Sequence, residues 1–183
     1  MAAQIHVGDT LRLLSTDGTL GGGTFHFDDT TNGAGEDLLS FCLQRSQHID
    51  YSSTFVVGGI TDFADDPGGN DYISPETRWI YSMFVGGALG AYQPDAIQAA
   101  LWKLEGEWNN DVGNSAALIV AAQTGVLNGF NGSNVKVLNL FYANGAPAQD
   151  QLYLAPVPEP ASMVLLGTGL LVLMRKRRTL TRG

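Results

Sequence analysis

Apolar residues in the first sixty positions form short runs that are separated by clusters of turn-forming residues. The runs cover residues 4–14, 24–27, 38–43 and 54–57, and Gly, Asp, Asn and Ser are frequent between them. Short apolar runs with such boundaries are typical of β-strands. The first third of the chain is therefore predicted to consist of strands, and the acidic, glycine-rich residues 65–71 are predicted to form a loop.

The middle of the chain has the apolar spacing of helices. Ser74-Pro75 predicts a helix start, because Ser is a favoured N-cap and Pro is tolerated at the first helical position. Apolar residues then recur at helical spacing, namely Trp79, Ile80, Met83 and Phe84. The pair Gly86-Gly87 is predicted to end this helix.

A second helix is predicted to begin after Pro94, where residues 95–98 fit a loose capping box. Its buried stripe is expected at Ile97, Leu101, Leu104 and Trp108. A third helix is predicted at residues 115–127, and residues 135–142 and 151–154 are predicted to be closing strands. The predicted fold class is therefore α+β, with antiparallel strands at both ends of the body and a central helical segment.

Length and composition narrow the range of functions. A chain of 183 residues is expected to form one domain, and its single cysteine excludes an intramolecular disulfide and a cysteine-rich metal site. The three histidines are far apart, so we expect no metal and no cofactor. Residues 1–174 contain all 18 acidic residues but only half of the ten basic ones. Because nucleic-acid binding depends on Lys and Arg that neutralise phosphates, we expect no nucleic-acid partner.

The C-terminal segment has three parts. The triplet Pro158-Glu159-Pro160 comes first, the uncharged apolar residues 161–174 follow, and the basic cluster at the end is Arg175, Lys176, Arg177 and Arg178. Basic residues beside an apolar span stay on the cytoplasmic side of a membrane. We therefore expect a short hydrophobic transmembrane helix, near the lower length limit for a span. The alternative is a buried C-terminal helix whose basic end suits its dipole.

This order of triplet, apolar stretch and basic end resembles the PEP-CTERM sorting signal of exported bacterial proteins. The resemblance implies recognition by an exosortase, transient residence in the inner membrane, and delivery to the cell surface or extracellular matrix of an exopolysaccharide-producing bacterium. We therefore divide the chain into an extracellular domain, residues 1–155, and a sorting signal, residues 156–183. Such tails are sometimes labelled ice-binding protein C-terminal domains, but the sequence has no repeated Thr rows of the kind that bind ice.

The beginning of the sequence lacks a part that exported proteins need. Residues 1–9 contain neither a basic region nor an apolar run of about 7–15 residues, so no secretory signal peptide is visible. We therefore expect the export signal to be encoded upstream of the present first residue.

Two short motifs in the body carry candidate chemistry. Phe41-Cys42-Leu43 lies on a predicted strand, and Gln98-Ala99-Ala100-Leu101-Trp102 opens the second predicted helix. Together they resemble the two signatures of thioester domains, over roughly residues 38–108. The resemblance implies that a Cys42 thiolate attacks the side-chain carboxamide of Gln98 and expels ammonia. The internal thioester that remains could acylate an amine or hydroxyl of a partner once per molecule.

The predicted place of Gln98 at a helix start would assist this reaction. The pKa of a cysteine, ordinarily about 8.5, falls beside a helix N-terminus, and free N–H groups in the first turn can stabilise an oxyanion. Simpler interpretations of both residues stay open. A lone cysteine is commonly a small buried hydrophobe, and a glutamine near a helix start suits a capping box.

The sequence therefore predicts an exported structural or adhesive surface protein rather than an enzyme. If the thioester forms, its partner is a surface nucleophile. The alternative is a noncovalent exopolysaccharide- or matrix-binding module that uses exposed aromatic side chains such as Trp108 and Tyr92.

Two further candidates have weaker patterns. A loose calcium site could use Asp65, Asp66 and Asp71, although the run does not match an EF-hand loop. Glu105 and Glu107 could be proposed as the paired carboxylates of a glycosidase. Residues two apart on a helix face different directions, however, so a solvated helix end is the favoured interpretation of the two glutamates.

Overall fold

Strands and helices follow one another along the chain in nearly the order that the apolar pattern predicts. The computed structural model describes residues 4–19, 21–32, 38–66 and 68–157. The strands are β1 (Thr10–Thr16), β2 (Phe25–Asp29), β3 (Leu38–Ser40), β4 (Thr54–Thr61), β5 (Phe63–Asp66), β6 (Gly69–Tyr72), β7 (Val135–Tyr142) and β8 (Gln151–Leu154). The helices are α1 (Pro75–Val85), α2 (Pro94–Leu104) and α3 (Ser115–Leu127).

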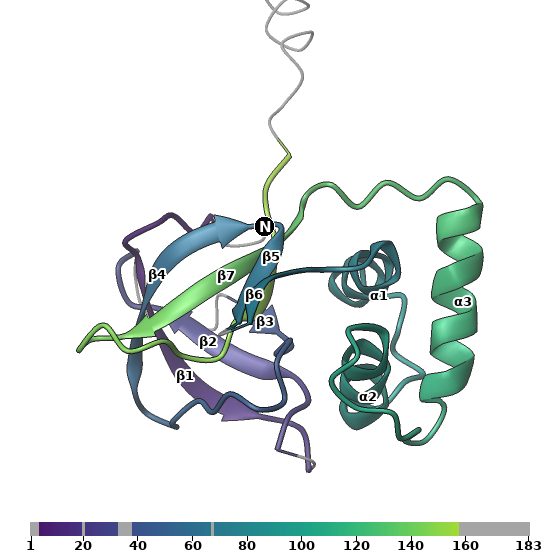
Figure 1. The fold of residues 1–183 in the computed structure, drawn as a ribbon, viewed down its shortest axis with the longest axis horizontal. Coiled ribbons are helices and arrows are strands. Elements are labelled where there is room, and N and C mark those ends of the chain that lie inside the picture. Colours follow the sequence, from purple (N-terminus) through teal and green to yellow (C-terminus); the bar gives the residue numbers. More distant parts are fainter. Residues whose placement is uncertain (1–3, 20, 33–37, 67, 158–183) are drawn as a thin grey trace, which may run out of the picture.

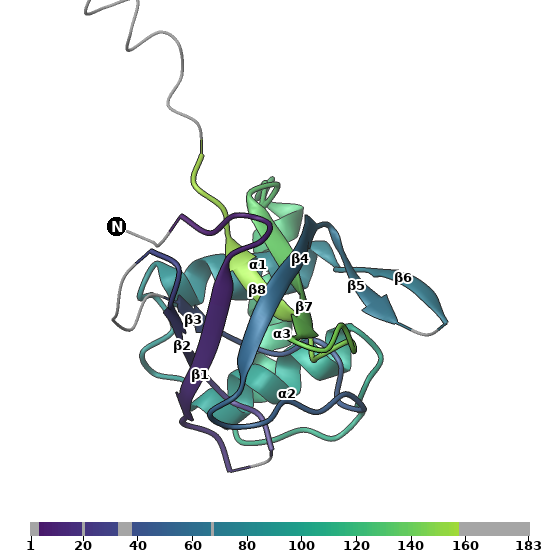
Figure 2. The same ribbon diagram turned by 90° about the vertical axis from the view of Figure 1, so that its left-hand side faces the viewer.

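The main sheet closes on itself. Six antiparallel strands have the order β3-β2-β1-β4-β7-β8, and β5 and β6 form a separate hairpin. The two edges meet because residues 41–43, which follow β3, pair with β8. Leu152 N donates to Phe41 O at 3.0 Å, and Leu43 N donates to Asp150 O at 3.2 Å. The result is a small barrel, from which the β5–β6 hairpin extends (Figures 1 and 2).

The barrel interior is apolar because successive side chains of a strand point to opposite faces. Leu11 and Leu13 of β1 are buried, whereas Arg12 between them points outward and donates to Asp28 of β2 at 2.9 Å. The buried side chains of this barrel cluster are Ile5, Leu11, Leu13, Phe25, Phe27, Leu38, Cys42, Phe55, Val57, Trp102, Leu138, Leu140, Ala148 and Tyr153.

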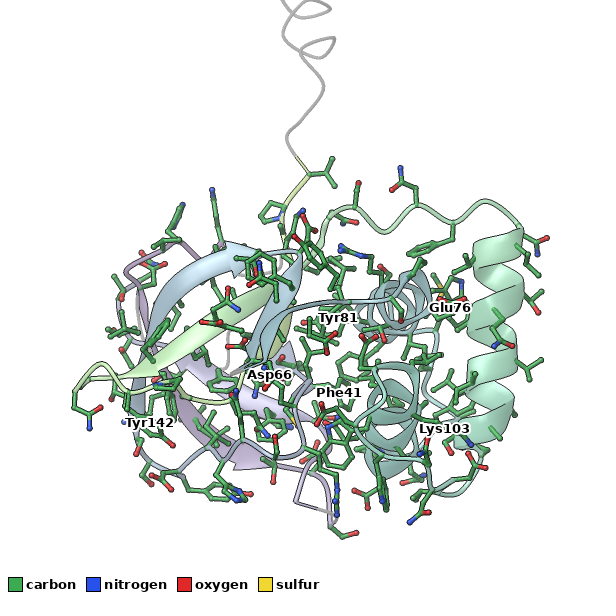
Figure 3. The ribbon with its side chains drawn as sticks, viewed as in Figure 1. Phe41, Asp66, Glu76, Tyr81, Lys103 and Tyr142 are labelled. Carbon is green, nitrogen blue, oxygen red and sulfur yellow. The ribbon has the colours of Figure 1, made fainter. Side chains whose placement is uncertain are left out.

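The three helices cover one side of the barrel, with α1 and α2 between the barrel and α3 (Figure 1). Phe41 and Tyr81 lie between the sheet and the helices (Figure 3). The Tyr81 hydroxyl donates to Leu39 O at 2.9 Å, and the rings of Phe41 and Phe84 meet edge to face at 4.8 Å. A second core, the helical cluster, consists of Phe41, Leu43, Ala64, Ile73, Ile80, Tyr81, Leu89, Ile97, Ala100, Leu101, Leu118, Ala122, Val135, Val137 and Leu152.

The structure confirms the α+β class, with strands on both sides of a central helical segment. The Ser74 N-cap is also confirmed, since Thr77 N donates to the Ser74 hydroxyl at 3.2 Å. The third helix and the two closing strands have the predicted bounds. The first strand is shorter than predicted, because it begins only at Thr10.

Three local predictions were wrong. Residues 65–71 do not form only a loop, because β5 and β6 pair there and the rings of Phe63 and Tyr72 meet across the hairpin at 5.4 Å. The start of α2 has no capping box, since Gln93 is the N-cap residue and makes no side-chain hydrogen bond there. Helix α2 ends at Leu104, so Trp108 is not part of its stripe.

The C-terminal hydrophobic helix and most of the sorting signal were predicted for residues 158–183, which lie outside the described residues. None of the helices in the described part of the chain is long and apolar enough to cross a membrane.

Candidate functional site

Cys42 lies at the closure of the barrel. It is directly opposite Gln151 in the pairing that joins the two sheet edges. Its neighbours Phe41 and Leu43 belong to the helical cluster, whereas Cys42 belongs to the barrel cluster. This alternation follows from the two-residue period of an extended chain. The thiol therefore points into the barrel and is fully buried.

Helix α2 presents Gln98 to the same interior. Gln98 and Trp102 are four residues apart, so they share one face of the helix. Trp102 packs into the barrel cluster, while Ile97 and Leu101, on another face, pack among the helices. Gln98 therefore lies on a different face of α2 from the apolar side chains that pack against the other helices.

The structure brings Cys42 and Gln98 into direct contact across 56 positions of sequence. Cys42 Sγ lies 3.4 Å from Gln98 Oε1, to which it donates, and Gln98 Nε2 donates to Cys42 O at 2.8 Å. Both residues are 0% exposed. The pair is therefore oriented by two hydrogen bonds, with the thiol next to the carboxamide that the sequence predicted as its reaction partner.

A glycine-rich strand connection packs against this pair. Gly23 N donates to Gln98 Oε1 at 3.4 Å. A side chain at Gly22 would meet Gln98 Cγ at 2.8 Å and the Trp102 ring at 2.9 Å, so only glycine allows this close approach. Asp95, near the start of α2, accepts from Thr19 N at 2.9 Å and from the Thr19 hydroxyl at 2.5 Å. These contacts attach the connection to the helix that carries Gln98.

The electrostatic surroundings differ from the sequence prediction. Burial raises the pKa of the Cys42 thiol far above its ordinary range; the Trp102 indole N–H opposes this shift, and the nearby Glu107 carboxylate adds to it. Gln98 is the fifth residue of α2, beyond the four free N–H groups of the first turn. The prediction that a helix terminus lowers the thiol pKa and supplies an oxyanion hole was therefore wrong.

The indole of Trp102 connects the buried pair to a partly exposed rim. Its N–H has no hydrogen-bond partner among the described residues. Its ring meets the half-buried ring of Trp108 edge to face at 5.9 Å, and the Arg45 guanidinium lies 5.8 Å and 5.0 Å from the two ring centres. Arg45 N in turn donates to Glu107 at 2.9 Å. Trp108 is thus a packed side chain of this rim rather than a fully exposed aromatic.

The remaining sequence candidates have structural partners. Glu105 accepts from Ser74 N at 3.2 Å, from the Ser74 hydroxyl at 2.7 Å and from the Thr77 hydroxyl, so it secures the start of α1. Burial raises its pKa. Glu107 instead contacts Arg45, and the two glutamates do not face one another as a catalytic pair. Tyr92 is partly buried and packs against the helical cluster.

The acidic residues of the β5–β6 hairpin do not form a metal site. Among the described residues, no group of three or more His, Cys, Asp or Glu side chains could hold an ion. Asp65 instead donates its N–H to Asp150 at 2.6 Å, and Asp150 also accepts from Asn139 Nδ2 at 2.9 Å and Leu140 N at 3.1 Å. Burial raises the pKa of Asp150 to about 6, although these three donors oppose the shift.

Sequence reasoning missed a set of buried glutamines beside the site. Gln44 and Gln149 are almost fully buried and Gln151 is fully buried. The run Gln149-Asp150-Gln151 at the start of a closing strand is the signal that could have found them, because consecutive polar residues are unusual where a strand is buried on both faces.

Comparison with known proteins identifies the C-terminal segment. The PEP-CTERM protein-sorting motif matches residues 156–178. No curated protein and no solved structure matches the chain. The motif implies recognition by an exosortase and export toward the cell surface. The match is to the sorting motif, and nothing in the comparisons supports an ice-binding label or a thioester-domain assignment for the body.

Proposed function

We propose that the folded body is a single-use surface adhesin in which Cys42 and Gln98 form an internal thioester. The observation that supports this function is the contact of the Cys42 thiol with the Gln98 carboxamide inside the barrel at 3.4 Å. The sorting motif delivers the domain to the cell surface or matrix, where a covalent bond to a partner would be useful. The protein reacts once and does not turn over, so it is not an enzyme.

The reaction balances with the groups already in contact. Cys42 Sγ forms a bond to the carboxamide carbon of Gln98, the bond from that carbon to Nε2 breaks, and the thiol proton leaves with the nitrogen as ammonia. The raised pKa of the Cys42 thiol means that no thiolate is stored. The proton is therefore transferred to Nε2 during the attack, as the bond between the carboxamide carbon and the nitrogen breaks.

The burial of the site restricts the captured nucleophile. Both residues are 0% exposed, and Gly22 packs against both Gln98 and the Trp102 ring. Only a slender group can reach the carbonyl carbon, which favours a primary amine on an unbranched stem, such as a lysine side chain. A sugar hydroxyl on a rigid ring is a poorer fit to this approach.

The mass of the intact chain tests the proposal. The thioester form of the full chain is expected to weigh less than its sequence by one ammonia, and methylamine is expected to add to it. Cys42→Ala removes the nucleophile, so this variant should have its full sequence mass and take up no methylamine. The variant Cys42→Ala also leaves a small apolar side chain in the barrel, so that loss of the mass deficit does not require loss of the fold.

The opposite result would support a different function. A wild-type chain with its full mass and an unmodified Cys42 contradicts the thioester. The protein would then be a noncovalent exopolysaccharide- or matrix-binding module, for which the rim of Arg45 and Trp108 is the candidate surface. Loss of exopolysaccharide binding in Trp108→Ala, with binding retained in Tyr92→Ala, would support that alternative.

A further inference from the structure

Gln151 lies beside Cys42 on the inner side of the barrel. The two residues are directly opposite in an antiparallel pair, and opposed side chains point to the same face, with Cβ atoms about 5 Å apart. That face is the barrel interior, because the barrel cluster contains Cys42, Leu138, which pairs with Gln151, and Tyr153, two residues further along β8. The Gln151 amide therefore enters the barrel next to the thiol.

This amide is buried without a hydrogen-bond partner. Gln151 is 0% exposed, and among the described residues neither its Nε2 nor its Oε1 has a partner. The finding does not depend on which way the amide is turned, because both atoms are unpaired. An unpaired buried amide destabilises a fold, and an apolar side chain of the same size would be preferred. Packing therefore does not explain a glutamine at this position.

A neighbouring glutamine shows the usual arrangement. Gln149 is also buried and its Oε1 has no partner among the described residues, but its Nε2 donates to Gln44 O at 2.9 Å and to Gln47 O at 2.8 Å. Those bonds tie the segment after Cys42 to the start of β8. Gln149 thus has a structural role that accounts for its polarity, whereas Gln151 has none in the resting state.

The reaction between Cys42 and Gln98 creates the missing partner. In the resting pair, Gln98 Oε1 accepts from the thiol and from Gly23 N at 3.4 Å. When the sulfur bonds to the carboxamide carbon and its proton passes to Nε2, this oxygen loses a donor and carries negative charge until ammonia leaves. Among the observed contacts, only the long hydrogen bond from Gly23 then remains on it.

We propose that Gln151 Nε2 donates to this oxygen in the tetrahedral intermediate and in the finished thioester. The inference rests on the proposed function and deepens it, because it assigns the donor that controls the reactivity of the same site. A donor that gains its acceptor only in the reacting state stabilises the transition state more than the ground state. The same donor acts when an external amine attacks the thioester, since the charge returns to the same oxygen.

Rates of closure and of methylamine uptake in full-length variants test this role. Chains that have a free Cys42 thiol and an intact Gln98 amide are refolded from the unfolded state. Their intact mass is followed first as ammonia is lost and then after methylamine is added. Gln151→Met keeps the length of the side chain but removes the amide. We expect this variant to close and to take up methylamine about 100-fold more slowly than wild type. Its Tm should equal or exceed that of wild type, because an unpaired buried amide is removed.

Gln149→Met is the matched control. It loses two hydrogen bonds, so its Tm should fall, while its closure rate should stay at the wild-type value. Closure of Gln151→Met at the wild-type rate overturns the inference and leaves the thioester intact. Slow closure of Gln151→Met with a Tm loss as large as that of Gln149→Met also overturns it, because a structural defect then explains the rate. A wild-type chain that never loses ammonia overturns the proposed function and this role together.

Discussion

Replacement of Gly22 by alanine should disturb both the fold and the reactive pair. The added methyl would lie 2.8 Å from Gln98 Cγ and 2.9 Å from the Trp102 ring, whereas ordinary contacts begin at 3.4 Å. The glycine does not have a positive φ, so the effect comes from packing rather than from backbone strain. The variant Gly22→Ala therefore isolates the contact between the glycine-rich connection and the site.

The magnitude follows from this geometry. Gln98 must move by about 0.6 Å to restore an ordinary contact with the new methyl, and overpacking of this kind costs about 1–3 kcal/mol of unfolding free energy. A displacement of about 1 Å between reacting groups can slow a reaction about 100-fold. Because Gln98 moves relative to Cys42, we expect thioester closure in Gly22→Ala to be about 10- to 100-fold slower.

Urea unfolding and intact-mass kinetics on the same preparations measure both effects. Gly90→Ala is the control, because a Cβ at position 90 meets nothing within 4 Å and that glycine has no positive φ. The control should be unchanged or more stable by about 0.4–1 kcal/mol. A Gly22→Ala chain as stable as Gly90→Ala, and closing at the wild-type rate, would refute the packing that we describe around Gln98.

Three other predictions concern pH, the start of α1 and sorting. The folded-state pKa of Asp150, about 6, lies above its ordinary value of 3.8, so the folded chain holds this proton more tightly than the unfolded chain does. Protonation of Asp150 therefore adds about 3 kcal/mol to the unfolding free energy below pH 3.8, and this contribution is lost as the pH rises through 6. Urea unfolding between pH 3.5 and about 7 should show this decline in the wild-type chain and a flatter curve in Asp150→Asn. Glu105→Ala leaves the hydroxyl donors at the start of α1 without their acceptor and should lower the unfolding free energy by about 2 kcal/mol, measured by the same assay. The control is Glu76→Ala, which changes a partly exposed glutamate in the first turn of the same helix. Glu159→Ala changes the Pro-Glu-Pro triplet inside the matched motif, so fractionation of an exosortase-positive host should show retained, unprocessed chain; normal surface delivery would contradict the sorting role of the triplet.

The local elements could be predicted from the sequence because they depend on neighbouring residues. Ser74-Pro75 sets the start of α1 through one cap and one fixed dihedral angle, and the observed hydrogen bond to Thr77 N confirms it. Four-residue spacing places Gln98 and Trp102 on one face of α2 in any fold that forms this helix. The order of triplet, apolar stretch and basic cluster identifies the sorting motif without reference to tertiary structure.

The β5–β6 hairpin and the start of α2 show where local reasoning was insufficient. Acidic and glycine-rich residues favour a turn, but the packing of Phe63 against Tyr72 extends strand pairing on either side of it. Asp95 resembles a capping residue, yet its carboxylate binds Thr19 from a distant connection. In both cases a contact between segments overrides the preference of the local sequence.

Only the tertiary structure decided what surrounds the candidate pair. The sequence predicted a cysteine on a strand and a glutamine on a helix. The closure of the barrel places Cys42 opposite Gln151 and within hydrogen-bonding distance of Gln98. Burial, which depends on every element that packs around the site, raises the thiol pKa where the sequence alone suggested that it would fall. Spacing along a chain determines which side chains share a face, whereas the solvation and the partners of a reactive group are set by the segments that fold over it.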